Sequence, residues 1–127
     1  MAEYLLDTNI LIHVFRGNAK PISLLKGILG EGHTAATCGV VIGEVYAGMR
    51  DRDAEVTRRL VGSLNYLEMS PAVAMRAGLM KRDFSAKGIT LSLADCLIAS
   101  VCMEHGVILV TENLKDFPAA GLQVRGI

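Results

Sequence analysis

The chain has 127 residues, of which 51% are hydrophobic, and its 13 lysine and arginine residues balance 13 aspartate and glutamate residues. This length and composition predict one domain over residues 1–127 with a sizeable buried core. The formal charge of zero excludes a protein that coats nucleic acid through many phosphate contacts, because each neutralised phosphate needs a cation. Any nucleic-acid ligand would therefore have to be held at a local site.

The cysteines and the N-terminus bear on the cellular compartment. Cys38, Cys96 and Cys102 are odd in number and show no C-x-x-C spacing, which predicts buried thiols in a reducing compartment. The N-terminus has no basic segment, and its apolar run is interrupted at Asp7, so we expect no signal peptide. The chain contains no stretch of about 18 uncharged apolar residues, so we expect no membrane span. We expect a cytoplasmic protein without a membrane segment.

Apolar runs and turn residues predict the first elements. Glu3–Leu6 is expected to form a short buried strand, and Thr8–Arg16 a helix that ends at the Gly-Asn pair after it. Pro21 suits the first turn of a second helix, which Gly30 and the glycine two residues later end. A second strand is expected over Thr34–Thr37.

The middle of the chain is predicted to be mainly helical. Val40–Met49 shows a helical pattern, and the mixed charges of Arg50–Val61 indicate a solvated helix or a continuation of the one before it. Leu64–Met69 is expected to form a third strand. Pro71 then begins a long helix that Lys87-Gly88 closes.

The last third completes an alternating pattern. Ser92–His105 is expected to form a helix, Val107–Val110 a strand, and Leu122–Arg125 an edge strand. Strands that alternate with helices predict an α/β protein in which helices flank a central, mostly parallel sheet of four or five strands. This is a three-layer sandwich.

Four acidic residues stand in mostly apolar surroundings. Asp7 directly follows the first expected strand, and Asp116 follows the strand Val107–Val110 within TENLKDF. Ligand sites of open α/β sheets form beyond the carboxyl ends of the strands, so both residues are expected at one edge of the sheet. Glu44 lies in VVIGEVYAGM, and Asp95 lies in TLSLADCLIAS.

Each acidic residue also has a purely structural interpretation. Asp7 could cap the helix that follows it, which is worth about 1 kcal/mol. Ser92 and Asp95 match a capping box, S-x-x-D, at the start of a helix. Glu44 could lie on a solvated helix face, and Asp116 could be an ordinary turn residue. For each residue taken alone, both interpretations remain open.

The four residues together favour a metal site. A parallel sheet can bring Asp7, Glu44, Asp95 and Asp116 together from four separate segments. Two carboxylates about 4 Å apart repel by about 4 kcal/mol at an effective dielectric constant of about 20, so such a cluster needs a divalent cation. Ligands that are all oxygen select hard ions, which predicts Mg²⁺ or Mn²⁺ rather than Zn²⁺.

Four blocks of sequence carry a family resemblance: LLDTNILI, VIGEVYAGM, LSLADCLIAS and ILVTENLKDF. In that order they resemble the PIN-domain ribonucleases, in particular the toxins of VapBC-type bacterial toxin–antitoxin modules. The resemblance covers nearly the whole chain. It implies a PIN-like sandwich, single-stranded or loop RNA as substrate, Mg²⁺- or Mn²⁺-dependent endonucleolytic cleavage, and a cognate antitoxin that occludes the site.

The resemblance also assigns roles to residues. The first three acidic residues of the family correspond to Asp7, Glu44 and Asp95. Many relatives carry the fourth two residues after the Thr that ends a strand; this chain has Asn113 there, so we assign the acidic role to Asp116. The residues expected to support these ligands are Thr8, Asn9, Ser92, Thr111 and Asn113.

Metal-activated water is the expected nucleophile. A divalent ion lowers the pKa of a bound water and neutralises the scissile phosphate, so no His, Ser or Cys nucleophile is needed. His13, His33 and His105 fall in unrelated contexts, and His105 precedes Gly106 at an expected helix end, where it would interact with the helix dipole. This distribution argues against a histidine-dependent ribonuclease.

Three other functions fit the sequence less well. A dinucleotide-binding domain requires G-x-G-x-x-G after a strand, which the chain lacks. A phosphatase that uses Asp7 as the nucleophile would want a second Asp two residues later, where Asn9 stands. A non-catalytic RNA- or protein-binding module on the same fold would gain from losing the four acidic groups. The second and third functions remain alternatives to a nuclease.

Basic residues and apolar surface predict the partners. High apolar content with only 5% aromatic residues predicts exposed apolar surface on a small domain. We therefore expect a homodimer and an antitoxin groove. The cations expected to line an RNA groove, with a solvated helix face as the alternative, are Arg50, Arg58, Arg59, Lys81 and Arg82.

Overall fold

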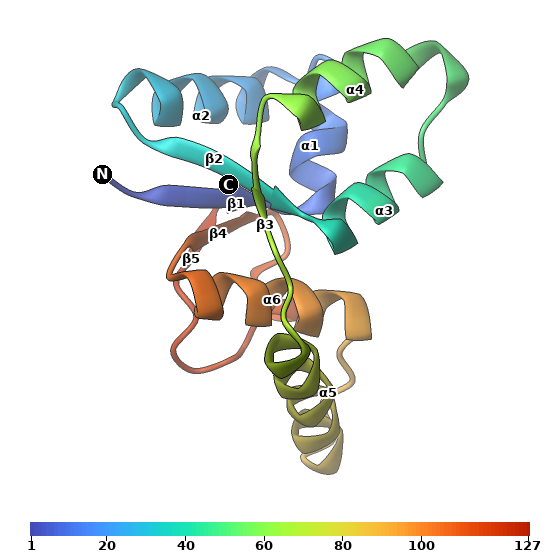
Figure 1. The fold of residues 1–127 in the computed structure, drawn as a ribbon, viewed down its shortest axis with the longest axis vertical. Coiled ribbons are helices and arrows are strands. Elements are labelled where there is room, and N and C mark those ends of the chain that lie inside the picture. The colour runs from blue at the N-terminus through green and yellow to red at the C-terminus, as the bar shows by residue number, and fades with distance from the viewer.

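A computed structural model describes residues 1–127 and shows a parallel β-sheet between layers of helices (Figure 1). The five strands are β1 (Glu3–Leu6), β2 (Thr34–Cys38), β3 (Asn65–Leu67), β4 (Ile108–Thr111) and β5 (Val124–Gly126). The six α-helices are α1 (Thr8–Phe15), α2 (Ala19–Gly30), α3 (Gly39–Ala47), α4 (Ala54–Gly62), α5 (Pro71–Ala86) and α6 (Leu93–His105). Two 3₁₀ helices are η1 (Asp51–Asp53) and η2 (Leu114–Asp116). The predicted α/β sandwich is confirmed.

The sheet has the strand order β3-β2-β1-β4-β5, and every neighbouring pair is parallel. In the centre, Leu5 of β1 lies opposite Ala36 of β2 and Leu109 of β4. The chain leaves β1 toward β2 and β3, then returns to β4 on the other side of β1. The strand order therefore reverses between β1 and β4, the place where open α/β sheets bind ligands.

Helices cover both faces of the sheet. α1, α2 and α4 lie on one side and α5 and α6 on the other, while α3 lies beyond the end of β2 (Figure 1). The central strand is covered on both sides, so Leu5 and Leu6 are fully buried and β1 reads as an apolar run. α5 packs against α6 and projects away from the sheet (Figure 1). On α5 the side chains of Met75 and Leu79 are 63% and 50% exposed.

One segment differs from its predicted structure. The expected solvated helix over Arg50–Val61 is instead the 3₁₀ helix η1 followed by α4. Arg50 Nε donates to Asp53 Oδ2 at 2.7 Å, and Asp53 is buried where η1 meets α4. Thr57 on α4 is also fully buried, so one face of this helix packs against the body of the protein. This packed face could not be predicted because charged residues dominate the sequence of the segment.

The remaining boundaries shift by one to a few residues. β4 extends to Thr111, one residue beyond the predicted strand, and β3 is shorter than predicted. The three cysteines are buried free thiols, as expected. None of the helices combines the length and apolar character that crossing a membrane requires.

Candidate active site

Asp7 lies at the reversal of strand order and is only 6% exposed. Its backbone N–H donates to the Val110 carbonyl of β4 at 2.9 Å, which continues the β1–β4 pairing. Its Oδ1 accepts from the Thr8 N–H at 2.9 Å, and its Oδ2 accepts from the Thr111 hydroxyl at 2.7 Å. Asp7 therefore caps α1 while its carboxylate sits between the ends of two neighbouring strands.

Two threonine hydroxyls connect Asp7 to its surroundings. Thr8 Oγ1 donates to Glu44 Oε1 on α3 at 2.7 Å. Thr111 Oγ1, besides donating to Asp7, accepts from the Asn113 N–H at 3.0 Å. These contacts tie together the ends of β1 and β4 and the exposed carboxylate of α3.

Asp95 enters from the start of α6. Ser92 caps this helix, because its Oγ accepts from the Asp95 N–H at 3.0 Å. This is the first half of the predicted capping box. The cap fixes the first turn of α6 and thereby places the half-buried Asp95 carboxyl group.

Electrostatics show that the four carboxylates share one region. Burial raises the pKa of Asp7; hydrogen bonds from Thr111 and Thr8 partly offset this rise, and the charges of Glu44 and Asp116 add to it. Burial also raises the pKa of Asp95 to about 6; Ser92 lowers it, and Asp7, Asp116 and Glu44 raise it further. The charges of Glu44 and Asp116 therefore act on both Asp7 and Asp95 at the carboxyl edge of the sheet.

The four carboxylates are not arranged around one common position in this structure. No group of three Asp, Glu, His or Cys side chains is arranged to hold a metal ion. Glu44 is exposed and engaged with Thr8, so its carboxylate would have to turn to join Asp7 and Asp95. The donors are nevertheless all carboxylate oxygens whose charges raise one another's pKa, as those of Glu44 and Asp116 do for Asp7, and oxygen donors suit a hard divalent cation.

The other predicted supporting residues differ in what they do. Asn113 contributes its backbone, because its N–H donates to Thr111 and its carbonyl accepts from the Asp116 N–H at 3.0 Å. This turn carries Asp116, in η2, toward Asp7. Asn9 is exposed on α1, and the structure gives its side chain no contact with the carboxylates.

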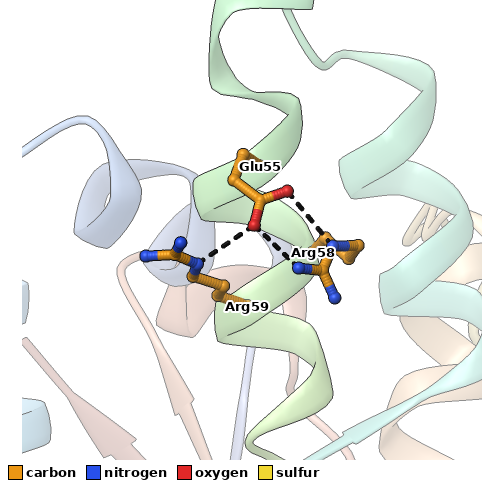
Figure 2. A network of polar contacts seen from close by, with 3 residues as sticks. All are labelled: Glu55, Arg58 and Arg59. Atoms are coloured by element: carbon orange, nitrogen blue, oxygen red, sulfur yellow. Dashed lines mark hydrogen bonds and ion pairs between the residues drawn. The ribbon is translucent and has the colours of Figure 1, made fainter.

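The predicted RNA-contacting cations already have partners. On α4, Glu55 Oε1 accepts from Arg58 Nη2 at 2.7 Å and from Arg59 Nε at 3.1 Å (Figure 2). These bonds lower the pKa of Glu55. The remaining contacts are Arg50 with Asp53, Arg82 with Asp83, and Lys81 Nζ with the carbonyl of Leu91. Four of the five side chains pair with carboxylates, and Lys81 donates to a neutral carbonyl.

One contact beside the site was not predicted. His13 Nδ1 on α1 lies 2.7 Å from Glu112 Oε1, in the segment after β4. The two residues are brought together because Asp7 and Thr111 end neighbouring strands, so the segments that follow them run side by side. The adjacency of β1 and β4 is the signal that would have found this pair.

The comparisons with known proteins agree with this geometry. A model of the PIN domain matches residues 4–121. The chain belongs to the PIN-domain family. The family resemblance seen in the four sequence blocks is confirmed.

Relatives of this PIN domain match over most of their length. It is 28% identical to ribonuclease VapC2 of Haemophilus influenzae over 122 residues. The aligned region covers 92% of this chain and 91% of the relative. It is 25% identical over 126 residues to a tRNA(fMet)-specific endonuclease VapC of Shigella flexneri, with coverage of 95% and 94%. Its fold matches VapBC2 from Rickettsia felis, crystallised with a DNA fragment from their promoter, with a TM-score of 0.84, 21% identity and 98% of both chains covered.

Proposed function

We propose that this PIN domain is a divalent-metal-dependent endoribonuclease, the toxin of a toxin–antitoxin pair, and that it cleaves single-stranded or loop RNA. The observation that carries the proposal is the position of Asp7 at the reversal of strand order, where its carboxylate is hydrogen-bonded to Thr8 and Thr111, Thr8 also bonds Glu44, and the charges of Asp7 and Asp116 act on Asp95. Matches over about nine-tenths of the length of relatives named ribonuclease VapC2 and ribonuclease VapC support RNA as the substrate.

The four carboxylates would hold the metal. VapC-type PIN nucleases generally depend on a divalent metal ion, and the all-oxygen donors favour Mg²⁺ or Mn²⁺ here. When bound, such an ion supplies a water of lowered pKa and a positive charge for the scissile phosphate. Thr8 and Thr111 hold Glu44 and Asp7 in place, and burial shields Asp7 from bulk water.

The same contacts disfavour an aspartyl-phosphate mechanism. Both oxygens of Asp7 accept hydrogen bonds, from Thr8 and from Thr111, and the side chain is nearly inaccessible. An attack on phosphorus needs a bulky phosphoryl group to reach the buried carboxylate, whereas a cation is small and each oxygen keeps a second lone pair for it. Asp7 is therefore better suited to binding a cation than to attacking a phosphate.

Partners follow from the same family. The solved VapBC complexes that share this fold support a cognate antitoxin, and we propose that it acts in the cytoplasm with the nuclease. The exposed apolar side chains Met75 and Leu79 on α5 offer a surface for a homodimer. A short gene beside this one that encodes a DNA-binding protein would support the toxin–antitoxin assignment.

Cleavage of single-stranded RNA by the purified protein tests the proposal. Activity should require Mg²⁺ or Mn²⁺ and disappear with EDTA. Asp95→Asn should reduce the rate by about a hundredfold or more, because it removes a charged oxygen from the site. Glu104→Gln is the matched control: it removes one charge from the far end of the same helix and should leave the rate unchanged. Equal cleavage in EDTA, or by Asp95→Asn, would overturn the proposal.

A further inference from the structure

A cavity of about 560 Å³ lies beside the candidate active site and contains none of the four carboxylates. His13 lines it from α1, the helix that Asp7 caps, and Glu112 lines it from the residue directly after Thr111. Asn18 and Lys20 line it from the start of α2, with Pro21 and Ile127 as apolar wall. The cavity and the carboxylates therefore share two structural elements.

The cavity has the size of a small-ligand site, because ligand pockets typically enclose about 300–1,000 Å³. Its lining is mainly polar, which suits a ligand with several hydrogen-bonding groups. His13 lies six residues beyond Asp7, which corresponds to about 9 Å along the axis of α1. A strand bound at the carboxylates can reach this cavity with a neighbouring nucleotide.

Lys20 supplies the cation for a phosphate. The five cations predicted to contact RNA are all engaged, four with carboxylates and Lys81 with a carbonyl. Lys20 is exposed and forms none of the ion pairs of this structure. It is the lysine or arginine side chain that lines the cavity.

Asn18 and His13 supply groups for a base. The Asn18 side chain makes no capping hydrogen bond to α2, so its amide donor and acceptor face no backbone partner there. Glu112, as an ionised carboxylate, only accepts, so the His13 Nδ1–H donates to it and the ring is held in one orientation. That leaves Nε2 and the ring face for stacking or hydrogen bonding with a base. The same contact occupies Oε1 of Glu112, the acidic side chain of the lining.

We propose that this cavity is a subsite for one nucleotide of the RNA strand, next to the bond that is cleaved. Lys20 binds its phosphate, and Asn18 and the His13–Glu112 pair contact its base. The inference rests on the proposed ribonuclease function, and it moves RNA contact from the paired arginines of α4 to the start of α2.

Binding of nucleoside 5′-monophosphates in EDTA tests the subsite without the metal or the reaction. AMP, GMP, CMP and UMP are titrated separately, and the His13 ring signals are followed by proton NMR. At least one nucleotide should shift these signals saturably, and Lys20→Gln should weaken its binding at least fivefold. Lys26→Gln, on the same helix but outside the cavity, is the matched control and should bind as the wild type does.

Three outcomes would overturn the subsite. They are equal binding by Lys20→Gln and Lys26→Gln, no shift of the His13 signals by any nucleotide, and equal affinity for inorganic phosphate alone, which would indicate an anion site instead. Glu44→Gln should bind the nucleotide normally, because Glu44 is not part of the cavity.

RNA cleavage separates failure of the subsite from failure of the proposed function. With an RNA that spans both sites, Lys20→Gln and Asn18→Ala should raise KM several-fold with little change in kcat. A protein that cleaves RNA in Mg²⁺ but binds no mononucleotide would refute the subsite alone. Lys20-dependent nucleotide binding without any RNA cleavage would refute the ribonuclease assignment and the RNA context of this cavity.

Discussion

The carboxylate of Asp7 is buried although it is ionisable, and its two hydrogen bonds explain how the fold tolerates it. Hydrogen bonds to a charged group are worth about 1.5–3 kcal/mol each, whereas burying an ion costs several kcal/mol. The raised pKa of Asp7 shows that Thr8 and Thr111 offset the cost of burial only in part. The remaining cost is what a bound cation would relieve.

Asp7→Asn should therefore abolish cleavage while the fold persists. Asparagine is as good a helix cap as aspartate, and its amide can face the Thr111 hydroxyl. Because the variant removes a buried charge near Glu44 and Asp116, the free energy of unfolding in metal-free buffer should rise, as the raised pKa of Asp7 indicates. Urea unfolding measures the stability, and an RNA cleavage assay measures the activity.

Asp51→Asn makes the same chemical change at an exposed position on η1 and should alter neither quantity. Wild-type cleavage by Asp7→Asn would show that Asp7 has no part in the reaction. A large loss of stability would show that its structural role dominates.

At the scale of elements, α6 joins the core to the site. Its middle is fully buried through Ile98 and Val101, while its first turn carries Asp95. Ser92 stabilises this turn with its cap. The position of Asp95 therefore depends on the first turn of a helix whose middle is fixed in the core.

Ser92→Ala should cost about 1 kcal/mol of stability, as the loss of a serine cap usually does. It should also lower the cleavage rate, because Asp95 loses both its fixed turn and a group that lowers its pKa. Ser70→Ala is the control, because Ser70 caps α5 in the same way, with Val73 N–H to Ser70 Oγ at 3.3 Å. Both variants are compared by thermal unfolding and by cleavage well below the transition. Equal activity in the two variants would show that the α6 cap has no role in catalysis.

The order of elements and the shared edge of Asp7 and Asp116 could be predicted because both follow from patterns local in sequence. Buried strands read as apolar runs, and parallel strands present their carboxyl ends together. The contact between His13 and Glu112 could not be predicted so directly, because it depends on which strands are neighbours. The ion pairs of Arg58 and Arg59 with Glu55 depend on side-chain conformations, which the order of charged residues does not determine.

At the scale of the whole molecule, the acidic site makes stability depend on pH. Asp95 has a pKa of about 6 in the folded protein against an ordinary value of 3.8. Between these values the folded state binds more protons than the unfolded state, so this contribution to stability is full below about pH 4 and is lost as the pH rises through about 6. Asp7 acts in the same direction.

In EDTA, the wild type should therefore gain stability relative to Asp95→Asn when the pH falls from 7 to 5. We expect a relative gain of at most about 1 kcal/mol, because only part of the effect of the raised pKa falls between these two pH values and solvent screening reduces it further. Urea unfolding at both pH values measures it. The comparison with the variant is needed because Glu55, whose pKa is lowered by Arg58 and Arg59, changes stability in the opposite sense. A difference between the two proteins that does not change with pH would contradict the elevated pKa of Asp95.

The two outermost strands, β3 and β5, have only three residues each. Each sheet edge therefore exposes few free backbone donors and acceptors, and edge-to-edge growth into fibrils has little template. Self-association is left to side chains, and the protruding α5 offers the same patch from each copy. Two identical patches that meet across a twofold axis cover each other and leave no patch free for a third copy. This surface therefore favours a dimer over a polymer.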